Sequence, residues 1–324
     1  MKTALIIGAA GQDGQYLSEH LTSLSYRVFR GTRRLSWESH DPNSPEVYCD
    51  IRDGVSLLSA IRKSWPDEIY NLAGQVYVPT SWDMPAETFD TNTIGLARIL
   101  MLVEQVKRDT KVYQASSSEM FGNCNGACTD ATPMNPTSPY GISKMAAHRL
   151  CRIYRDRGLY VVSGILFNHE SPRRSHEMVT RKIARKVAEW AVTKSGEKNP
   201  LVLGNMLARR DWGFAGDYVK AMHLMLQQNE PTDYVVGTGE SHSVSEFLEV
   251  ARLEMALSSE FVKEYTVIDP RFVRTQEIYD MKADSEKIKR RTGWEPEYGF
   301  RELVRTMVWA EFNAMLGKKE LVSQ

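Results

Sequence analysis

A tyrosine and a lysine four residues apart, with a carboxylate upstream of them, form the pattern in this chain best suited to chemistry. These residues are Tyr140 and Lys144, preceded by Glu119, which lies two positions after Ser117. Positions i and i+4 share one face of a helix, so Tyr140 and Lys144 can point into the same pocket. An ammonium beside a phenol stabilises the phenolate, which predicts that the pKa of Tyr140 falls from about 10 towards that of a general base. Glu119 adds a second acid or base, which is useful where a proton must also leave carbon.

Each of these residues also has a plainer interpretation. The Tyr-x-x-x-Lys spacing occurs by chance, and Glu119 could cap a helix or pair with a surface lysine. The surroundings favour catalysis, because Glu119 follows Ser117 just beyond a predicted strand, and a glycine-rich turn lies near the start of the chain.

Short β-branched segments alternate with helical segments through the first half of the chain, and these are the elements that must position the candidate residues. We expect strands at residues 3–7, 26–29, 46–49, 68–72, 111–115 and 160–167, with helices from 15, over 55–63 and over 93–106. Alternating strand and helix predicts an α/β fold of the Rossmann type, with a doubly wound parallel sheet. Residues 202–203 and 234–236 are expected as later strands of the same sheet, and Asp217 as the N-cap of a helix over 218–228.

The remaining segments carry many charged and aromatic residues, and strands and helices alternate little in them. We therefore expect two domains. Residues 1–167 with about 201–239 would form the Rossmann domain, and about 168–200 with 240–324 a smaller, discontinuous α/β substrate domain over the carboxyl ends of the strands.

A glycine-rich turn follows the first expected strand and precedes a helix. It reads Gly8-Ala9-Ala10-Gly11-Gln12-Asp13-Gly14. Glycines at such a turn let backbone N–H groups approach a pyrophosphate at the helix N-terminus. The spacing is Gly-x-x-Gly-x-x-Gly rather than the usual dinucleotide fingerprint, but its place in a βαβ unit favours nucleotide binding.

The end of the second strand indicates which nicotinamide cofactor binds. An acid there suits NAD, whereas arginine suits the 2′-phosphate of NADP. The chain has Arg33, Arg34 and Ser36 at this place and no acid until Glu38, which favours NADP, although a solvated basic loop is the alternative. Further contacts are expected from Asp50 and Ile51 after the third strand and from Leu72-Ala73-Gly74-Gln75-Val76 after the fourth.

Bulk composition narrows the class of protein. Lys+Arg and Asp+Glu both number 41 in 324 residues, which argues against non-specific nucleic-acid binding. Four cysteines are too few and too scattered for a disulfide framework, which predicts a reducing compartment, and the Cys124-x-x-x-Cys128 spacing lacks the second pair that a metal site needs. The start of the chain has no signal-peptide pattern and no apolar run reaches membrane-spanning length, so we expect a cytoplasmic protein with no membrane partner.

Five stretches of the sequence are distinctive: Gly11-Gln12-Asp13-Gly14, QASSSEMFG at 114–122, GILFNHESPRR at 164–174, Arg210-Asp211-Trp212-Gly213 and DPRFVRTQE at 269–277. In these stretches the chain resembles the extended short-chain dehydrogenase/reductase family and, within it, the GDP-mannose 4,6-dehydratases. The resemblance extends over nearly the whole chain.

The resemblance implies site residues by position. The catalytic set falls on Ser117, Glu119, Tyr140 and Lys144. Cofactor contacts fall on Gly8 to Gly14, Arg33, Arg34, Leu35, Ser36, Asp50, Ile51, Leu72 to Val76, Tyr140, Lys144, His169 and Arg174. Substrate contacts fall on Ser81, Ser117, Glu119, Asn168, Lys182, Arg210, Arg274 and Glu277. From its chemistry alone, His169 could equally be a satisfied core histidine.

Three departures from the family are visible. Ser117 stands where the family usually has threonine, which keeps the hydroxyl. The loop after Arg34 is shorter than in the family, where it helps to build a tetramer, so the resemblance implies a homodimer and leaves the tetramer open. The segment between Leu257 and Val267 is also shorter.

The implied reaction is dehydration of GDP-mannose to a 4-keto-6-deoxy sugar nucleotide by internal hydride transfer through bound NADP. The closest alternatives are an NADPH-dependent GDP-4-keto-6-deoxysugar reductase, a dehydratase acting on a GDP-heptose and a GDP-sugar epimerase. A non-catalytic NADP-sensing protein is a further alternative from a different class. Glu119 separates dehydratase from reductase, because a reductase needs no carbon acid chemistry.

Overall fold

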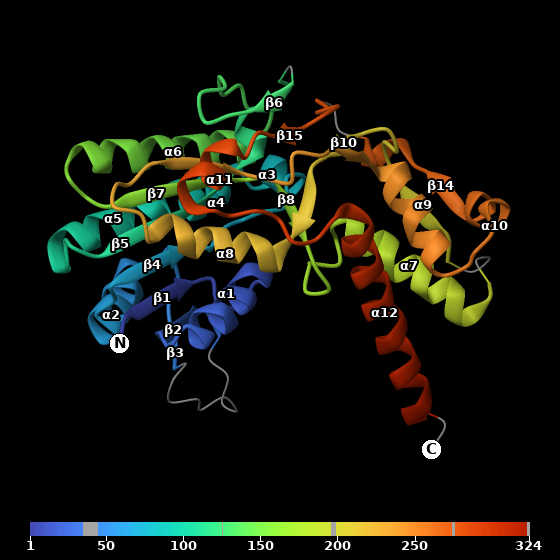
Figure 1. Ribbon diagram of the computed structural model, residues 1–324, viewed down its shortest axis with the longest axis horizontal. Coiled ribbons are helices and arrows are strands. Elements are labelled where there is room, and N and C mark those ends of the chain that lie inside the picture. The colour runs from blue at the N-terminus through green and yellow to red at the C-terminus, as the bar shows by residue number, and fades with distance from the viewer. Residues whose placement is uncertain (35–44, 125, 196–198, 274–275, 323–324) are drawn as a thin grey trace.

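A parallel sheet of seven strands forms the centre of the larger part of the molecule (Figure 1). The computed structural model describes residues 1–34, 45–124, 126–195, 199–273 and 276–322. The strand order is β12-β7-β5-β4-β1-β2-β3. All strands are parallel, but β2 and β3 are added on one side of β1, and the chain then continues with β4 on its other side, so the switch point lies between β1 and β4. The strands are β1 (Thr3–Ile7), β2 (Arg27–Thr32), β3 (Glu46–Tyr48), β4 (Glu68–Asn71), β5 (Lys111–Ser117), β7 (Val161–Leu166) and β12 (Asp233–Val236). This is the expected doubly wound fold, and ligands bind such sheets at the carboxyl ends near the switch point.

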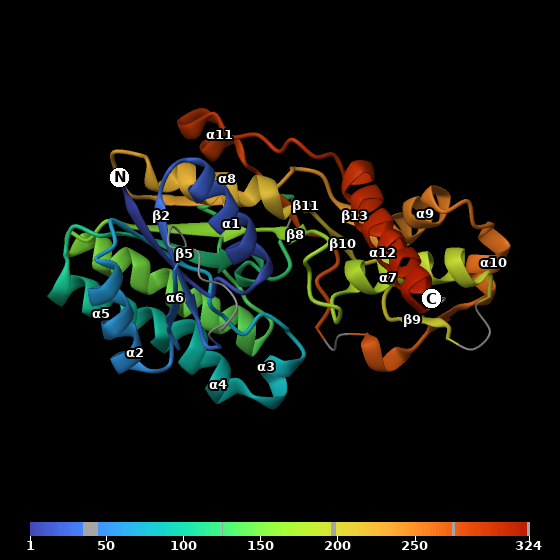
Figure 2. The same ribbon diagram turned by 90° about the horizontal axis from the view of Figure 1, so that it is seen from below.

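Helices cover both faces of this sheet (Figure 2). On one face lie α1 (Gln12–Ser23), α8 (Ala215–Leu226) and α11 (Glu286–Thr292), whose apolar residues pack with the sheet in one cluster. On the other face lie α2 (Gly54–Ser64), α5 (Gly95–Val106) and α6 (Pro139–Asp156), which pack in a second cluster. Strands buried on both faces explain why the first half of the sequence shows continuous apolar runs rather than alternation.

A smaller unit packs at the carboxyl ends of the strands, on the right in Figure 1. Its helices are α7 (Val179–Thr193), α9 (Val244–Glu254), α10 (Ser259–Glu264) and α12 (Phe300–Val322). Short strand pairs accompany them: β9 (Leu201–Leu203) with β14 (Thr266–Ile268), β10 (Arg209–Arg210) with β13 (His242–Ser243), and β11 (Trp212–Phe214) with β8 (Asn168–Glu170). Its core is centred on Trp190, Trp212 and Phe247.

We propose two domains on the basis of these clusters, with boundaries adjusted from those expected. Leu201 and Leu203 pack in the core of the smaller unit, whereas Ile288 and Trp294 pack with the sheet. A discontinuous division is kept, but β9 then belongs to the smaller domain and α11 to the larger one.

Two element predictions are wrong. Residues 202–203 do not join the main sheet, because β9 pairs with β14 instead. Asp217 is not an N-cap but lies inside the first turn of α8, where its buried carboxylate accepts hydrogen bonds from the backbone N–H groups of Glu297 and Tyr298. A carboxylate bonded in this way ties the chain before α12 to α8, and sequence spacing carries no sign of that partner.

Cys124 and Cys128 form a disulfide. Cys128 is the last residue of β6 (Ala127–Cys128). Cys49 and Cys151 are free and buried. Among the described residues, no helix combines the length and the apolar character needed to cross a bilayer.

Candidate active site

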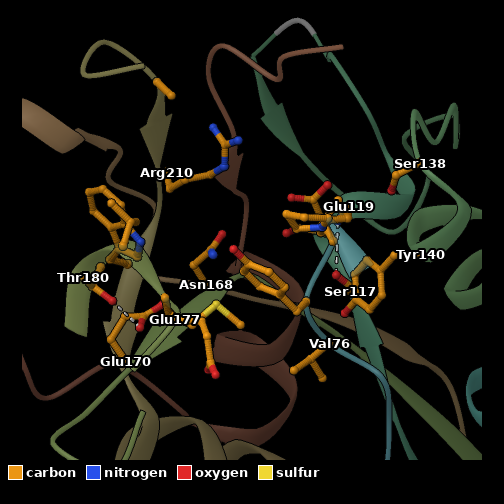
Figure 3. Close-up of a pocket in the computed structure, with 18 of the residues that line it drawn as sticks. Val76, Ser117, Glu119, Ser138, Tyr140, Asn168, Glu170, Glu177, Thr180 and Arg210 are labelled. Carbon is orange, nitrogen blue, oxygen red and sulfur yellow. Dashed lines mark hydrogen bonds between the residues drawn. The ribbon is translucent and has the colours of Figure 1, made fainter. Parts of the chain in front are cut away.

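A cavity of about 620 Å³ lies between the carboxyl ends of the central strands and the smaller unit. Figure 3 shows Ser117, Glu119 and Tyr140 on one side of it, with Asn168 and Arg210 across from them. The structure thus brings together side chains that are more than 90 positions apart along the chain, from Ser117 to Arg210. The full set of predicted residues on its wall is Asp13, Leu72, Val76, Ser117, Glu119, Tyr140, Lys144, Asn168, His169, Arg174, Lys182, Arg210 and Glu277.

The turn after β5 places Ser117 and Glu119. Ser117 is the last residue of the strand and is buried. Its hydroxyl accepts a hydrogen bond from the backbone N–H of Glu119 at 3.2 Å, which closes the single 3-10 turn Ser118–Met120. Because this turn follows the strand without a linker, the Glu119 carboxylate is carried on a rigid element at the cavity wall.

The start of α6 places Tyr140 and Lys144. Ser138 caps the helix by accepting from the Gly141 N–H at 3.0 Å, and Pro139 occupies the first helical position. A Cβ on Gly141 would lie 2.7 Å from the Glu119 carbonyl oxygen, so only glycine lets the helix approach the Glu119 turn this closely. Local sequence chemistry therefore fixes the distance between the tyrosine helix and the glutamate turn.

The ionisation of Tyr140 and Lys144 differs from the expectation. Burial raises the pKa of Tyr140 to about 12, with Glu119 also raising it and hydrogen bonding from Ser117 acting in the opposite direction. The predicted lowering by Lys144 is wrong for this structure, because its ammonium donates to the Ala115 carbonyl at 3.0 Å and lies 5.9 Å from the tyrosine ring centroid. Burial in turn lowers the pKa of Lys144 to about 8. Without further positive charge in the cavity, the tyrosine is a neutral phenol.

A buried asparagine links the loop after β4 to α6. Asn92 lies in the π-helical turn Asp90–Ile94, and its side chain is paired with both backbone groups of Gln75, at 2.9 and 3.0 Å. The same amide donates to the hydroxyl of Ser143 at 3.0 Å, one position before Lys144. π-helical turns are often found at functional sites. Here the turn holds the predicted cofactor loop at a fixed distance from the catalytic helix.

The glycine-rich turn fits a dinucleotide. Gly8 has φ +91°, and a Cβ there would lie 2.8 Å from the backbone nitrogen of Ala73, so the turn and the loop after β4 are in close contact. Helix α1 begins at Gln12 with Gly11 as its N-cap, and no side chain caps its first N–H groups. Open N–H groups at a helix N-terminus suit a pyrophosphate. Asp13 and His169, both predicted as cofactor contacts, are bonded to each other at 2.9 Å.

The residues predicted to recognise the adenosine end are partly described. Arg33 and Arg34 are exposed after β2, and Thr32 donates to the Arg34 carbonyl at 2.8 Å. Asp50 is paired with Arg52 at 3.0 Å, and Ile51 is buried. Leu35 and Ser36 lie outside the described residues, as does Arg274 on the substrate side.

Three basic side chains from other elements line the cavity, two of them paired with carboxylates. Arg210 is buried, donates to the Ile278 carbonyl at 2.7 Å and lies 3.5 Å from the Glu277 carboxylate. Lys182 lies 4.6 Å over the ring of Phe272, and partial burial lowers its pKa. Arg174 is paired with the buried Glu170 at 3.1 Å. Cations that converge on a cavity are what a diphosphate needs.

One predicted substrate contact lies apart from this wall. Ser81 is fully buried and donates to the Val78 carbonyl at 2.6 Å, and it is not among the described residues that line the cavity. Its neighbour Trp82, which was not predicted, does line the cavity.

Sequence reasoning missed other wall residues as well. Glu170, Thr180 and Phe272 line the cavity, and Thr180 donates to the Glu170 carboxylate at 2.6 Å. Neither spacing nor residue type marks these positions. The Thr180–Glu170 bond joins α7 to β8, and Phe272 reaches the cavity from the turn 270–272, where it packs against Lys182. Asn92 likewise gives no signal within an otherwise helical segment.

Comparisons with known proteins agree with this geometry. The family described as GDP-mannose 4,6 dehydratase matches residues 5–307. "GDP-mannose 4,6 dehydratase 1" of Arabidopsis thaliana is 43% identical over 340 residues, which cover 99% of this chain and 92% of that protein. The Homo sapiens protein named GDP-mannose 4,6 dehydratase is 38% identical over 344 residues, covering 96% and 92%. The solved dTDP-glucose 4,6-dehydratase of Bacillus anthracis in complex with NAD has a TM-score of 0.81 at 23% identity, covering 97% of this chain and 98% of that one, a likeness in fold.

Proposed function

The chain belongs to the GDP-mannose 4,6-dehydratase family, and we propose that it removes water from GDP-mannose by internal hydride transfer, with NADP as a bound cofactor. The observation that carries this proposal is the Glu119 carboxylate on the same cavity wall as Ser117 and Tyr140. A ketoreductase on this scaffold would need the serine, tyrosine and lysine only. A second acid or base beside them is what elimination requires.

When bound, NADP supplies a reversible hydride acceptor for the sugar carbons. Tyr140 as phenolate takes the proton of the C4 hydroxyl as C4 is oxidised to a ketone, and Ser117 orients that oxygen by hydrogen bonding. Ser117 and Arg174 are the groups of this chain that favour the phenolate over the buried phenol. Lys144, whose ammonium donates to the Ala115 carbonyl, lines the same cavity.

Glu119 acts on the next two carbons. The C4 ketone makes the C5 hydrogen acidic, and the Glu119 carboxylate removes it. The resulting carboxylic acid protonates the C6 hydroxyl, which leaves as water, so the proton taken from C5 departs with the leaving group. The hydride held by the bound cofactor would then return to C6, C5 would take up a proton from solvent, and Tyr140 would release the proton that it took from the C4 hydroxyl. The product is GDP-4-keto-6-deoxy-mannose, and the cofactor ends in its starting oxidation state.

The rest of the cavity holds the GDP-sugar in this proposal. Lys182 and Arg210 are placed to bind the diphosphate, and Asn168 and Glu277 to bind polar groups of the sugar nucleotide. Arg210 is fixed by its bond to the Ile278 carbonyl, so little side-chain entropy is lost when it engages a phosphate.

A homodimer is part of the proposal. The sheet face covered by α5 and α6 carries exposed apolar side chains on and next to those helices. They are Ile94, just before α5, Met101 on α5, and Ile142 and Ile153 on α6. Such a face suits the same face of a second copy. A tetramer depends on the segment after Arg34, most of which lies outside the described residues. The cytoplasmic location expected from the sequence stays a prediction.

The test is incubation of the purified protein with GDP-mannose without added reductant, followed by mass spectrometry. We expect conversion to a product lighter by one water. An unchanged mass with a solvent-derived hydrogen at C5 would indicate epimerisation, and turnover that needs added NADPH would indicate a reductase. A GDP-heptose offered in parallel decides between the two sugars, since none of the described residues on the cavity wall distinguishes them.

A further inference from the structure

An acid lies in the first turn of α1, the end of the helix at which doubly wound folds bind a pyrophosphate. Asp13 is the second residue of the helix and lines the cavity. A carboxylate suits a helix N-terminus by itself, because it interacts favourably with the helix dipole. It is unfavourable next to a phosphate, because two negative charges then compete for the same N–H groups.

The structure pairs this acid with a histidine from the edge of the smaller unit. Asp13 Oδ2 lies 2.9 Å from Nε2 of His169, and the other ring nitrogen lies 2.8 Å from the Phe167 carbonyl oxygen. Both partners can only accept hydrogen bonds, so the state of His169 that satisfies both is the doubly protonated imidazolium. Burial lowers the pKa of His169, but Asp13 outweighs it and the pKa is raised, which agrees with this state.

Further bonds hold the pair in place. The ring of His169 stacks on Tyr218 with centroids 4.7 Å apart. Gln12 donates to the His169 carbonyl at 3.1 Å and accepts from the Ser171 hydroxyl at 2.7 Å. The first turn of α1 is thereby bonded at three points to β8 and the residue after it. Gln12 also donates to Asp13 Oδ1 at 3.0 Å, so the direction of the carboxylate is fixed by its own helix on one oxygen and by His169 on the other.

We propose that His169 serves the cofactor site as a positioning residue, by neutralising Asp13 and holding its carboxylate away from the pyrophosphate, rather than by touching the dinucleotide. This inference rests on the proposed use of NADP. Without the imidazolium, the carboxylate keeps its charge, and only the Gln12 amide, at 3.0 Å from Oδ1, and the more distant Arg174 still act on it. A poorly compensated charge a few ångströms from a phosphate, at an effective dielectric constant of about 20, lowers affinity on the order of 10- to 100-fold.

A double-mutant cycle on the full-length protein tests the inference by NADP+ affinity, measured by isothermal titration calorimetry. His169→Gln should weaken binding by on the order of 10- to 100-fold. Adding Asp13→Asn to His169→Gln should recover most of that loss, because the offending charge is gone. His176→Gln, a change at an exposed histidine in the following turn, is the matched control and should leave affinity unchanged.

The outcomes separate the explanations. If the loss in His169→Gln persists undiminished in the double variant, His169 contacts the dinucleotide directly and the inference is overturned. Asp13→Asn alone is nearly isosteric and serves even if His169→Gln does not fold. Its affinity should equal or exceed that of the unmodified protein, and a loss of about tenfold or more would contradict the inference. Failure of the folded, unmodified protein to bind NADP+ would instead refute the proposed function.

Discussion

Replacing Lys144 by methionine should leave the protein at least as stable at pH 7 while abolishing turnover. Burial lowers the pKa of this lysine from 10.5 to about 8. At pH 7 the buried amine of the folded protein is therefore still protonated, and burial of this charged group destabilises the folded state. The difference corresponds to roughly 3 kcal/mol of stability that the ionised amine costs. Lys144→Met removes this cost but leaves the Ala115 carbonyl without its donor, which costs about 1–3 kcal/mol. The two effects predict a free energy of unfolding that is unchanged or higher by up to about 2 kcal/mol.

The pH dependence supplies the sharper readout. The pKa of Lys144 is lower in the folded state than in the unfolded chain, so its unfavourable contribution is full below about pH 8 and disappears as the pH rises towards 10.5. The unmodified protein should therefore gain roughly 1 kcal/mol from this group between pH 8 and pH 9, and Lys144→Met should lose that gain. Urea unfolding at pH 7, 8 and 9 measures both quantities on nucleotide-free protein.

The exposed Lys63→Met change is the control, and it should leave both the stability and its pH dependence unaltered. The reasoning is refuted if Lys144→Met is destabilised by several kcal/mol at pH 7 and keeps the slope of the unmodified protein between pH 8 and pH 9.

Other changes probe the site from other sides. Glu119→Gln should slow water loss by about 10²-fold or more while hydride transfer at C4 persists. Reduced cofactor should then accumulate, which its near-ultraviolet absorbance measures, and water loss at a near-normal rate would contradict the role of Glu119. Gly141→Ala puts a Cβ 2.7 Å from the Glu119 carbonyl oxygen and should cost about 1–3 kcal/mol of stability and reduce kcat, whereas Gly54→Ala, where the added methyl meets nothing within 4 Å, is the control. Arg210→Lys should raise the KM for GDP-mannose about tenfold or more with a smaller change in kcat, and a KM unchanged from that of the unmodified protein would remove Arg210 from the diphosphate site.

Local chemistry made much of the site predictable. The spacing of Tyr140 and Lys144 is enough to predict that they share a helix face. The glycine-rich turn is recognisable because it follows a predicted strand and precedes a helix. Burial on both faces gives the strands of the sheet their continuous apolar runs, which is why all seven of them could be located from the sequence.

Long-range partners were not predictable from spacing. Arg210 and Glu277 are 67 positions apart and came only from resemblance to a family. Residues 202–203 were assigned to the wrong sheet, because two apolar β-branched or aliphatic residues fit any strand pair. Asp217 looked like a cap because its partners, the N–H groups of Glu297 and Tyr298, lie about 80 residues away.

The ionisation of Tyr140 shows a different limit. A neighbouring lysine predicts a lowered pKa, but the desolvation of a phenol is a property of everything packed around it. The sequence shows that a lysine lies near Tyr140, but it does not show which other residues bury the phenol. The same limit applies to Asn92, whose three bonds are visible only once the π-helical turn has brought it beside Gln75 and Ser143.

Deuterium placed at C4 of GDP-mannose follows the hydride through the reaction and tests the central claim most directly. With the unmodified protein and no added reductant, the label should appear at C6 of the 4-keto-6-deoxy product, with a hydrogen from solvent at C5. Loss of the label to the medium or to exchangeable cofactor, or its retention at C4, would contradict internal hydride transfer by this chain.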